Sequence, residues 1–279
     1  MDVPVFYTEA QNAPPQTISP SASKPREVMK RWRKRGFRMD VRTPDPATVT
    51  DLARAHDRKY VEDVLAGRTH NGFLNESRAV ARSLPWTNGA MLSAARCAIE
   101  ESTISCAPVS GFHHAKWSRP SGFCTFNGLM VTALALKAKG LARRVGILDC
   151  DQHFGDGTDE IIQRVSATDW IAHVSAGRDY PREAKAFLKA FPGIVKAFAG
   201  CDVVLYQAGA DPHIEDPLGG FLDDEQLAER DTIVFTQARK LGIPVAWNLA
   251  GGYQEPLSKV LDIHDRTMEA CILALRYPA

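Results

Sequence analysis

The feature that most constrains the fold of this chain is an alternation of short apolar segments, rich in β-branched residues, with long amphipathic segments. This alternation is typical of repeated strand–helix units around a largely parallel sheet. It predicts strands at residues 3–7, 105–109, 144–148, 169–174, 202–206 and 244–248, and helices at residues 88–101, 127–139, 181–199, 224–241 and 256–276. We therefore expect an α/β fold in which helices flank one largely parallel sheet.

The organisation along the chain favours a single domain. The sequence has 279 residues and contains no internal repeat, low-complexity tract or linker. Single α/β domains routinely reach this length. We therefore expect residues 1–279 to form one domain, with the Pro- and Ser-rich segment 12–25 as a long surface loop.

The charge balance limits the classes of partner. The chain has 34 basic and 33 acidic residues, a formal net charge of +1. A dedicated nucleic-acid binder is usually strongly basic, so we expect no nucleic-acid partner. The basic run at residues 30–38 is expected to be the solvated face of a helix, with Val28 and Trp32 pointing inward.

The sequence also predicts the cellular location of the protein. No window approaches the ~18 consecutive apolar residues of a membrane span, and the first residues lack the pattern of a secretion signal. The six cysteines have no paired spacing, which favours reduced thiols over disulfides. We therefore expect a cytoplasmic protein without a membrane partner.

Glycines and chemically active residues follow four of the predicted strands. These segments are 111–114, 149–157, 207–211 and 249–253, with the sequences GFHH, DCDQHFGDG, QAGAD and LAGGY. In open parallel sheets, ligands bind outside the carboxyl ends of the strands. The four segments are therefore expected to converge on one crevice.

Three of these residues are candidate metal ligands. Asp151 and His153 are two positions apart on an extended segment, so their side chains point to the same side. Asp211, from another strand end, supplies a second carboxylate. Mixed oxygen and nitrogen ligands with an open position are typical of a catalytic zinc site, although manganese and iron also suit them. From spacing alone, the alternative that these residues only cap turns stays open.

A zinc ion held by two carboxylates needs further groups for catalysis. The two carboxylates nearly neutralise the charge of the ion. It therefore lowers the pKa of a bound water less than a zinc ion held by three imidazoles does. His113 and His114 are candidate bases, each ideally backed by a carboxylate. Tyr253, which follows two glycines, is a candidate donor to a developing oxyanion. This set predicts a hydrolase that acts on a carbonyl group.

Four blocks of sequence resemble the histone deacetylase superfamily, which includes acetylpolyamine amidohydrolases and acetoin-utilisation proteins. The blocks are 111–127 (GFHHAKWSRPSGFCTFN), 149–158 (DCDQHFGDGT), 208–220 (AGADPHIEDPLGG) and 250–253 (AGGY). They keep the family order and span about half of the chain. More weakly, residues 3–7 and 55–61 resemble the opening strand and an early helix of the family.

The resemblance implies an arginase/deacetylase-like α/β fold and a distinct role for each residue of the site. It implies zinc held by Asp151, His153 and Asp211, and a hydrogen bond from Tyr253 to the reaction intermediate. His114, paired with Asp156, is implied as the general base and then the acid, and His113, paired with Asp149, as an electrostatic partner. Some relatives have His in place of this tyrosine and are poor deacetylases, so Tyr253 favours activity.

The resemblance also implies a second cation and a channel. A monovalent cation, usually potassium, is implied at Asp149, Asp151, His153, Ser175 and Ala176. Gly122, Phe123 and Leu218 are implied to line a narrow channel for the acyl-bearing part of the substrate. His213 is expected to lie at the rim or in a hydrogen bond rather than on the metal.

Three departures from the family pattern are visible. Phe154 stands where many members have a second histidine, although that histidine is not a zinc ligand in the family. The residues after Ser175 are Ala176 and Gly177, where a histidine is common two positions on. The chain is also shorter than typical members, and we expect the shortfall in loops at the mouth of the pocket.

These observations predict a zinc-dependent amidohydrolase that removes an acetyl or other acyl group from an amine. The expected substrate is a peptidyl acyl-lysine or a small acetylated amine such as a polyamine. A related metallohydrolase acting on an ester or another amide, and a deacetylase-like binding protein without activity, remain the alternatives. A homo-oligomer, in which a second subunit completes the mouth of the pocket, is also left open.

Overall fold

The computed structural model describes residues 1–14, 17, 19–179 and 182–276, and its described strands form one parallel sheet. The seven strands lie in the order β2-β1-β3-β7-β6-β4-β5. Their bounds are Val3–Phe6 (β1), Met39–Arg42 (β2), Ile104–Ser110 (β3), Val145–Asp149 (β4), Ile171–Ser175 (β5), Val203–Gln207 (β6) and Val245–Ala250 (β7). The order places β4, β6 and β7 side by side, although they are far apart along the chain.

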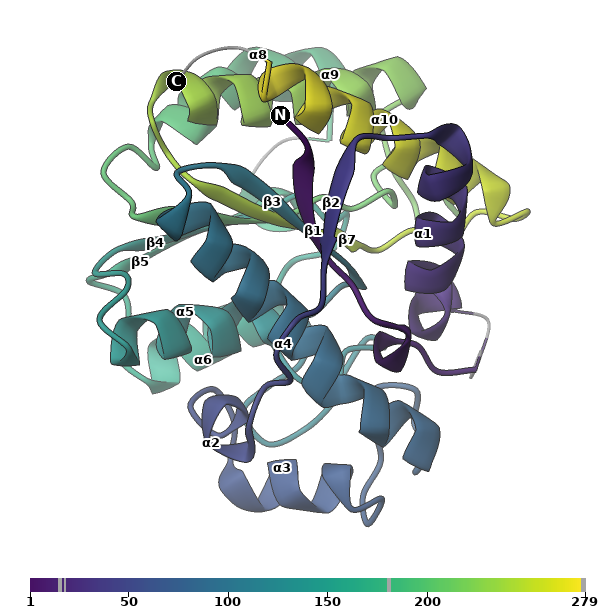
Figure 1. The fold of residues 1–279 in the computed structure, drawn as a ribbon, viewed down its shortest axis with the longest axis vertical. Coiled ribbons are helices and arrows are strands. Elements are labelled where there is room, and N and C mark those ends of the chain that lie inside the picture. The colour runs from purple at the N-terminus through teal and green to yellow at the C-terminus, as the bar shows by residue number, and fades with distance from the viewer. Residues whose placement is uncertain (15–16, 18, 180–181, 277–279) are drawn as a thin grey trace.

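Helices cover both faces of this sheet (Figure 1). Their bounds are Lys24–Arg35 (α1), Val49–Leu52 (α2), Arg58–Leu65 (α3), Arg78–Glu100 (α4), Gly128–Ala138 (α5), Asp156–Arg164 (α6), Ala176–Asp179 (α7), Ala184–Lys196 (α8), Asp224–Lys240 (α9) and Ser258–Ala274 (α10). In Figure 1, α8, α9 and α10 lie on one side of the sheet and α4, α5 and α6 on the other. The predicted α/β class, with helices flanking a parallel sheet, is confirmed.

Two apolar layers hold these helices on the sheet. Successive side chains of a strand point to opposite faces, so Cys106 of β3 packs into the layer under α1, α8, α9 and α10. Its neighbour Ala107 packs into the layer under α4, α5 and α6. Because both faces are covered, β6 and β7 are buried along their whole length and β3 is buried up to its last residue, as is typical of parallel sheets.

All six predicted strands are present, with ends displaced by at most two residues. The strand that the sequence analysis missed is β2, which pairs with β1 at the edge of the sheet. Its four residues, MDVR, are partly or fully exposed. An edge strand with two charged residues has no apolar run, so the pattern that predicts strands is absent.

Three predicted segments need correction. Helix α4 begins at Arg78 rather than residue 88 because Ser77 caps it, and it tolerates Pro85 in its interior. The expected loop 12–25 ends early, since α1 begins at Lys24, while residues 15, 16 and 18 lie outside the described residues. The helix expected from residue 181, which is also outside them, begins as α8 at Ala184.

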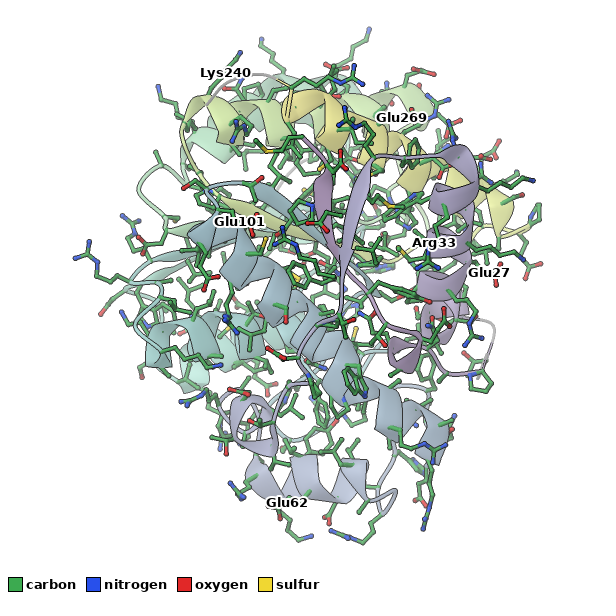
Figure 2. The ribbon with its side chains drawn as sticks, in the orientation of Figure 1. Glu27, Arg33, Glu62, Glu101, Lys240 and Glu269 are labelled. Atoms are coloured by element: carbon green, nitrogen blue, oxygen red, sulfur yellow. The ribbon has the colours of Figure 1, made fainter. Side chains whose placement is uncertain are left out.

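The basic segment forms part of α1 and behaves as predicted. Val28 and Trp32 are buried against the sheet. Arg35 forms an ion pair with Asp265 of α10, so part of the positive charge is used between the two helices. Arg33 is exposed, and Figure 2 shows its side chain with other charged residues at the surface of the helices.

None of the helices in the described part of the chain combines the length and the apolar content that a membrane crossing requires.

The imidazole of His56 connects the turn before α3 to the segment between β3 and α5. Its Nδ1–H donates to the carbonyl of Lys116 at 2.9 Å, and its Nε2 accepts the Asn127 N–H at 2.8 Å. Only the neutral ring can make both bonds, because Nε2 of the protonated ring is itself a donor and cannot accept. Burial lowers the pKa of His56 from 6.5 to about 4.

We expect acid to destabilise the protein through His56. Because its pKa is lower in the folded state, the unfolded chain binds more protons between pH 6.5 and about 4. The stabilisation is present above pH 6.5 and is lost towards pH 4, a change of about 3 kcal/mol. Urea unfolding at pH 7 and pH 4 measures it. In His56→Gln, whose amide can make both bonds but does not titrate, the difference between the two pH values should shrink by this amount; an unchanged difference contradicts the assignment.

Candidate active site

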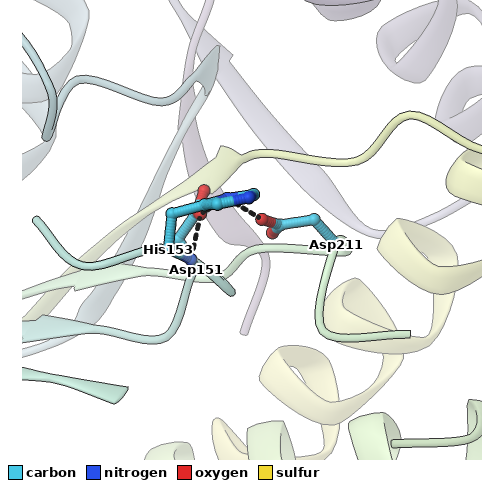
Figure 3. Close-up of side chains that lie close together, drawn as sticks. All are labelled: Asp151, His153 and Asp211. Atoms are coloured by element: carbon cyan, nitrogen blue, oxygen red, sulfur yellow. Dashed lines mark hydrogen bonds and ion pairs between the residues drawn. The ribbon is translucent and has the colours of Figure 1, made fainter. Parts of the chain in front are cut away.

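Asp151, His153 and Asp211 converge at the carboxyl edge of the sheet (Figure 3). Asp151 and His153 follow β4, and Asp211 follows the neighbouring strand β6. Their candidate ligand atoms all lie within 4.8 Å of one another. His153 Nδ1 is 3.2 Å from Asp151 Oδ1 and 3.2 Å from Asp211 Oδ2. The structure thus brings together the three residues that the sequence analysis proposed as ligands.

Backbone donors hold the two carboxylates in place. The Gly251 N–H donates to Asp151 Oδ2 at 3.0 Å, and the Gln152 N–H donates to Asp211 Oδ2 at 3.1 Å. A Cβ on Gly251 would lie 2.7 Å from Asp151 Oδ2 and from the carboxyl carbon of Asp211. Only glycine allows the β7 turn to approach the carboxylates this closely.

The electrostatics of the cluster favour a bound cation. Both carboxylates are buried, and Asp211 Oδ1 has no hydrogen-bond partner among the described residues. Burial and the adjacent charge of Asp151 raise the pKa of Asp211 well above its usual range. Two carboxylate oxygens and an imidazole nitrogen are a donor set that divalent zinc accepts. The residues present therefore fit a divalent metal ion.

Two histidine–carboxylate pairs lie beside the cluster. His113 Nδ1 is 2.7 Å from Asp149 Oδ2, and His114 Nδ1 is 2.7 Å from Asp156 Oδ1. The two imidazole rings are 4.1 Å apart, and His113 Nε2 lies 3.6 Å from Asp151. Each carboxylate binds Nδ1 of its histidine and so fixes the orientation of the imidazole ring. Nε2 of each histidine takes no part in this hydrogen bond.

The two histidines have opposite preferences for a proton. Burial disfavours the charged form of His113, but the carboxylates of Asp149 and Asp151 outweigh it and raise its pKa to about 9. Burial, together with the positive charge of His113, lowers the pKa of His114. Neighbouring groups whose pKa values are driven apart are typical of acid–base sites.

Asp149 lies at the centre of a hydrogen-bond network that the sequence analysis did not find. Gln207, at the end of β6, donates to Asp149 Oδ1 at 2.8 Å and accepts the Phe112 N–H at 3.1 Å. Ser175 is the register partner of Asp149 on β5, and its hydroxyl accepts the Gly155 N–H at 3.0 Å. The predicted potassium residues thus lie on adjacent strand ends, while the ion itself remains a prediction.

A tight turn places Gly122 and Phe123 against the site. Ser121 and Cys124 exchange both backbone hydrogen bonds, at 3.1 and 2.8 Å. Gly122 and Phe123 between them have positive φ values of 49° and 61°. A Cβ on Gly122 would lie only 2.3 Å from Cδ2 of His114. The turn therefore packs directly against the ring of the candidate base.

We expect Gly122→Ala to lower kcat at least tenfold because the new Cβ displaces His114. Metal binding should persist, since His114 is not a candidate ligand. Left-handed strain alone costs about 1–2 kcal/mol, and Gly36→Ala controls for it: Gly36 has φ 70°, but a Cβ there meets no described atom within 4 Å. Steady-state kinetics, metal content and thermal unfolding separate these effects. Equal activity in the two variants would show that the contact with His114 is unimportant.

Tyr253 and Leu218 are linked through Asp216, which the sequence analysis quoted without a role. One oxygen of Asp216 accepts the Tyr253 N–H at 2.8 Å, and the other accepts the Leu218 N–H at 3.0 Å. The ring of Phe123 lies 5.8 Å from that of Tyr253. Burial raises the pKa of Tyr253, and the charges of Asp151 and Asp211 add to the effect. Its hydroxyl therefore keeps its proton and can serve as a hydrogen-bond donor.

The residue that departs from the family pattern, Phe154, has its own partner. The guanidinium of Arg178 lies 4.4 Å from the centre of the Phe154 ring, and Arg178 also pairs with Asp179 at 2.6 Å. An arginine stacked on an aromatic face is an attractive contact. The side chain of Arg178 thus packs on the ring of Phe154, in the loop that follows β4.

Lys24, at the start of α1, is a second residue that sequence reasoning missed. It is fully buried, and its ammonium donates to the carbonyls of Ala250 and Gly251 at 2.6 and 3.2 Å. The ammonium thereby holds the turn that follows β7 in place. No local pattern distinguishes Lys24 from the other lysines, so the sequence carries no sign of this contact.

Comparison with known proteins places the chain in a family. The family model for the histone deacetylase domain matches residues 20–183. The chain is 30% identical over 208 residues to an uncharacterized protein of Picosynechococcus, covering 67% of this chain and 65% of that protein. It is 28% identical over 250 residues to a probable deacetylase of Methanothermobacter thermautotrophicus, covering 75% of this chain and 73% of that protein.

The crystal structure of the HDA15 HD domain has the same fold. It superposes with a TM-score of 0.78 at 21% identity, and the match covers 97% of this chain and 91% of that one. The chain belongs to the histone deacetylase family. The resemblance predicted from the four sequence blocks is thus confirmed.

Proposed function

We propose that the protein is a zinc-dependent deacylase that hydrolyses an amide between an acyl group and a primary amine. Membership of the histone deacetylase family supports the reaction class. The observation that carries the proposal is the placement of the His114–Asp156 pair beside a three-residue metal cluster. The rings of His114 and His153 have centroids 6.0 Å apart, so base and candidate ligand border the same space.

Asp151, His153 and Asp211 would hold the zinc ion. When bound, zinc supplies Lewis-acid polarisation of the substrate carbonyl and of the attacking water. Its positive charge would also offset the negative charge of the two buried carboxylates.

The remaining residues move protons and stabilise charge. His114, oriented by Asp156, takes a proton from the attacking water and later delivers one to the leaving amine. His113, held by Asp149, acts as an electrostatic partner beside the reacting carbonyl. Tyr253 donates a hydrogen bond to the oxygen on which negative charge develops.

We expect a narrow channel at Phe123 and Leu218, which would favour a slender acyl-amine substrate. The ring of Phe123 lies 5.8 Å from that of Tyr253, and Leu218, which shares Asp216 with Tyr253, is 45% exposed. A peptidyl acyl-lysine and a small acetylated amine both present such an aliphatic arm. We propose this substrate class without distinguishing the two.

The proposal includes two predictions from the resemblance. Potassium is expected at Asp149 and Ser175, with main-chain oxygens of Asp151, His153 and Ala176. Residues 1–279 are expected to behave as one deacetylase-like domain.

A substrate panel tests the reaction class. Protein loaded with one equivalent of zinc is incubated with acetyl-lysine peptides, acetylpolyamines and acyl esters, and amine or acid release is measured. Turnover of an amide supports the proposal. Turnover of esters alone would favour a different hydrolase, and no turnover would favour a binding protein.

A further inference from the structure

Arg230 of α9 is a charged residue with no exposure to solvent. It contacts the turns after β4 and β6. Removing a guanidinium from water costs several kcal/mol unless partners compensate it. An apolar side chain would fill the same space at lower cost, so the contacts of this arginine need an explanation.

Those contacts reach the backbone of both ligand-bearing turns. Nη1 of Arg230 donates to the carbonyl of Cys150 at 3.2 Å and to the carbonyl of Gly209 at 2.8 Å. Cys150 directly precedes Asp151, and Gly209 is two residues before Asp211. A single nitrogen thus connects the two turns whose side chains form the metal cluster.

The turns approach each other closely at this point. A Cβ on Gly209 would lie 2.8 Å from the Cα of Asp151 and 2.5 Å from Oδ1 of Asp211. Carbonyl groups that approach one another repel, and a cationic donor shared between them removes that repulsion. The distance between Asp151 and Asp211 therefore depends on a donor at this position.

Asp231 holds the guanidinium itself in place. Its Nε donates to Asp231 Oδ1 at 2.8 Å, and that oxygen also accepts the hydroxyl of Tyr206. The other oxygen of Asp231 accepts the Thr267 hydroxyl from α10 at 2.6 Å. The planar fork of arginine can make these bonds in two directions at once, which a lysine ammonium cannot do in the same geometry.

We propose that Arg230, oriented by Asp231, is a positioning residue that sets the separation of Asp151 and Asp211 and thereby the affinity and geometry of the metal site. The proposal rests on the proposed function only in taking these aspartates as metal ligands. Arg230 touches neither substrate nor metal, and it acts through the carbonyls of Cys150 and Gly209.

The test is titration of the metal-free protein with Co²⁺ and Zn²⁺ alone, without substrate. Arg230→Met fills the space but removes every donor, and we expect its metal affinity to fall by about 10- to 100-fold, as for other residues that support metal ligands. Arg230→Lys keeps the charge and one donor, so its loss should be smaller. The visible spectrum of bound Co²⁺ should shift in both variants, because the ligand geometry changes.

Val234→Ala is the matched control. Val234 is buried one turn further along α9, and its truncation destabilises the same helix without touching either turn. Its metal affinity should stay roughly within twofold of the wild type and its Co²⁺ spectrum should be unchanged. Thermal unfolding of all three variants shows how much each loses in stability.

The outcomes are distinguishable. If the wild type binds metal and the Arg230 variants bind it equally well with the same spectrum, the positioning role is overturned while the proposed function stands. If Val234→Ala loses as much affinity as Arg230→Lys, the effect is one of general stability and the proposal is again overturned. If the wild type binds no metal at this cluster, the proposed function itself fails.

Discussion

An Asp211→Ala variant is expected to bind no zinc, whereas the wild type binds about one ion per chain. Asp211 supplies one of three candidate ligands, and the only other carboxylate of the cluster among the described residues is that of Asp151. With one aspartate and one imidazole left, the site loses both a bond and half of its negative charge. Activity should be lost together with the metal.

The stability of the variant separates ligand loss from misfolding. In the metal-free protein the removal of Asp211 relieves its unfavourable burial beside Asp151, but it also removes the acceptor of the Gln152 N–H, so the two effects oppose each other. The metal-free variant should therefore unfold at a temperature close to that of the wild type. Zinc at about 100 times its Kd stabilises a binding protein by about 2.7 kcal/mol, and this increase should be absent from the variant.

Asp265→Asn is a matched control for this prediction. Asp265 is also buried, but its partners are Arg31 and Arg35 of α1, away from the metal cluster. The control should retain one zinc per folded chain. Metal analysis after dialysis decides the matter: full zinc content in Asp211→Ala would reject the ligand assignment.

Tyr253→Phe is expected to lower kcat by about 10²- to 10³-fold, the effect of losing one oxyanion donor. The ring and its contact with Phe123 stay, so the channel keeps its shape. The backbone bond from Tyr253 to Asp216 is also unaffected. Zinc content should not change, since the hydroxyl is not a candidate ligand.

Tyr60→Phe tests whether any buried tyrosine hydroxyl has this effect. The Tyr60 hydroxyl donates to the carbonyl of Thr125 at 2.8 Å, so its loss costs stability of about 1 kcal/mol. Its kcat should remain close to that of the wild type. A Tyr253→Phe enzyme as fast as Tyr60→Phe would remove Tyr253 from the mechanism.

The elements that the sequence predicted well are those with a local pattern. The central strands are buried on both faces and therefore appear as short apolar runs. Asp151 and His153 are recognisable because their spacing on one segment is itself the ligand geometry. Asp211 could be added because it also follows a strand, and parallel strands end at one edge of the sheet.

The residues that were missed have no such pattern. Gln207 and Asp216 support His113 and Tyr253 through single hydrogen bonds between segments far apart in the chain. Lys24 and Arg230 are charged residues in ordinary helical surroundings, and only the tertiary structure buries them. Such supporting roles depend on pairings across the sheet, which one sequence without its fold does not encode locally.

The strand order has a consequence for when the protein can acquire its metal. Asp151, Asp211 and Gly251 meet only after β4, β6 and β7 are aligned, and the bond from Gly251 to Asp151 joins residues 100 positions apart. Such distant parallel pairings are intrinsically slow to form. We therefore expect the proposed zinc site to be complete only after β7 has paired with β6.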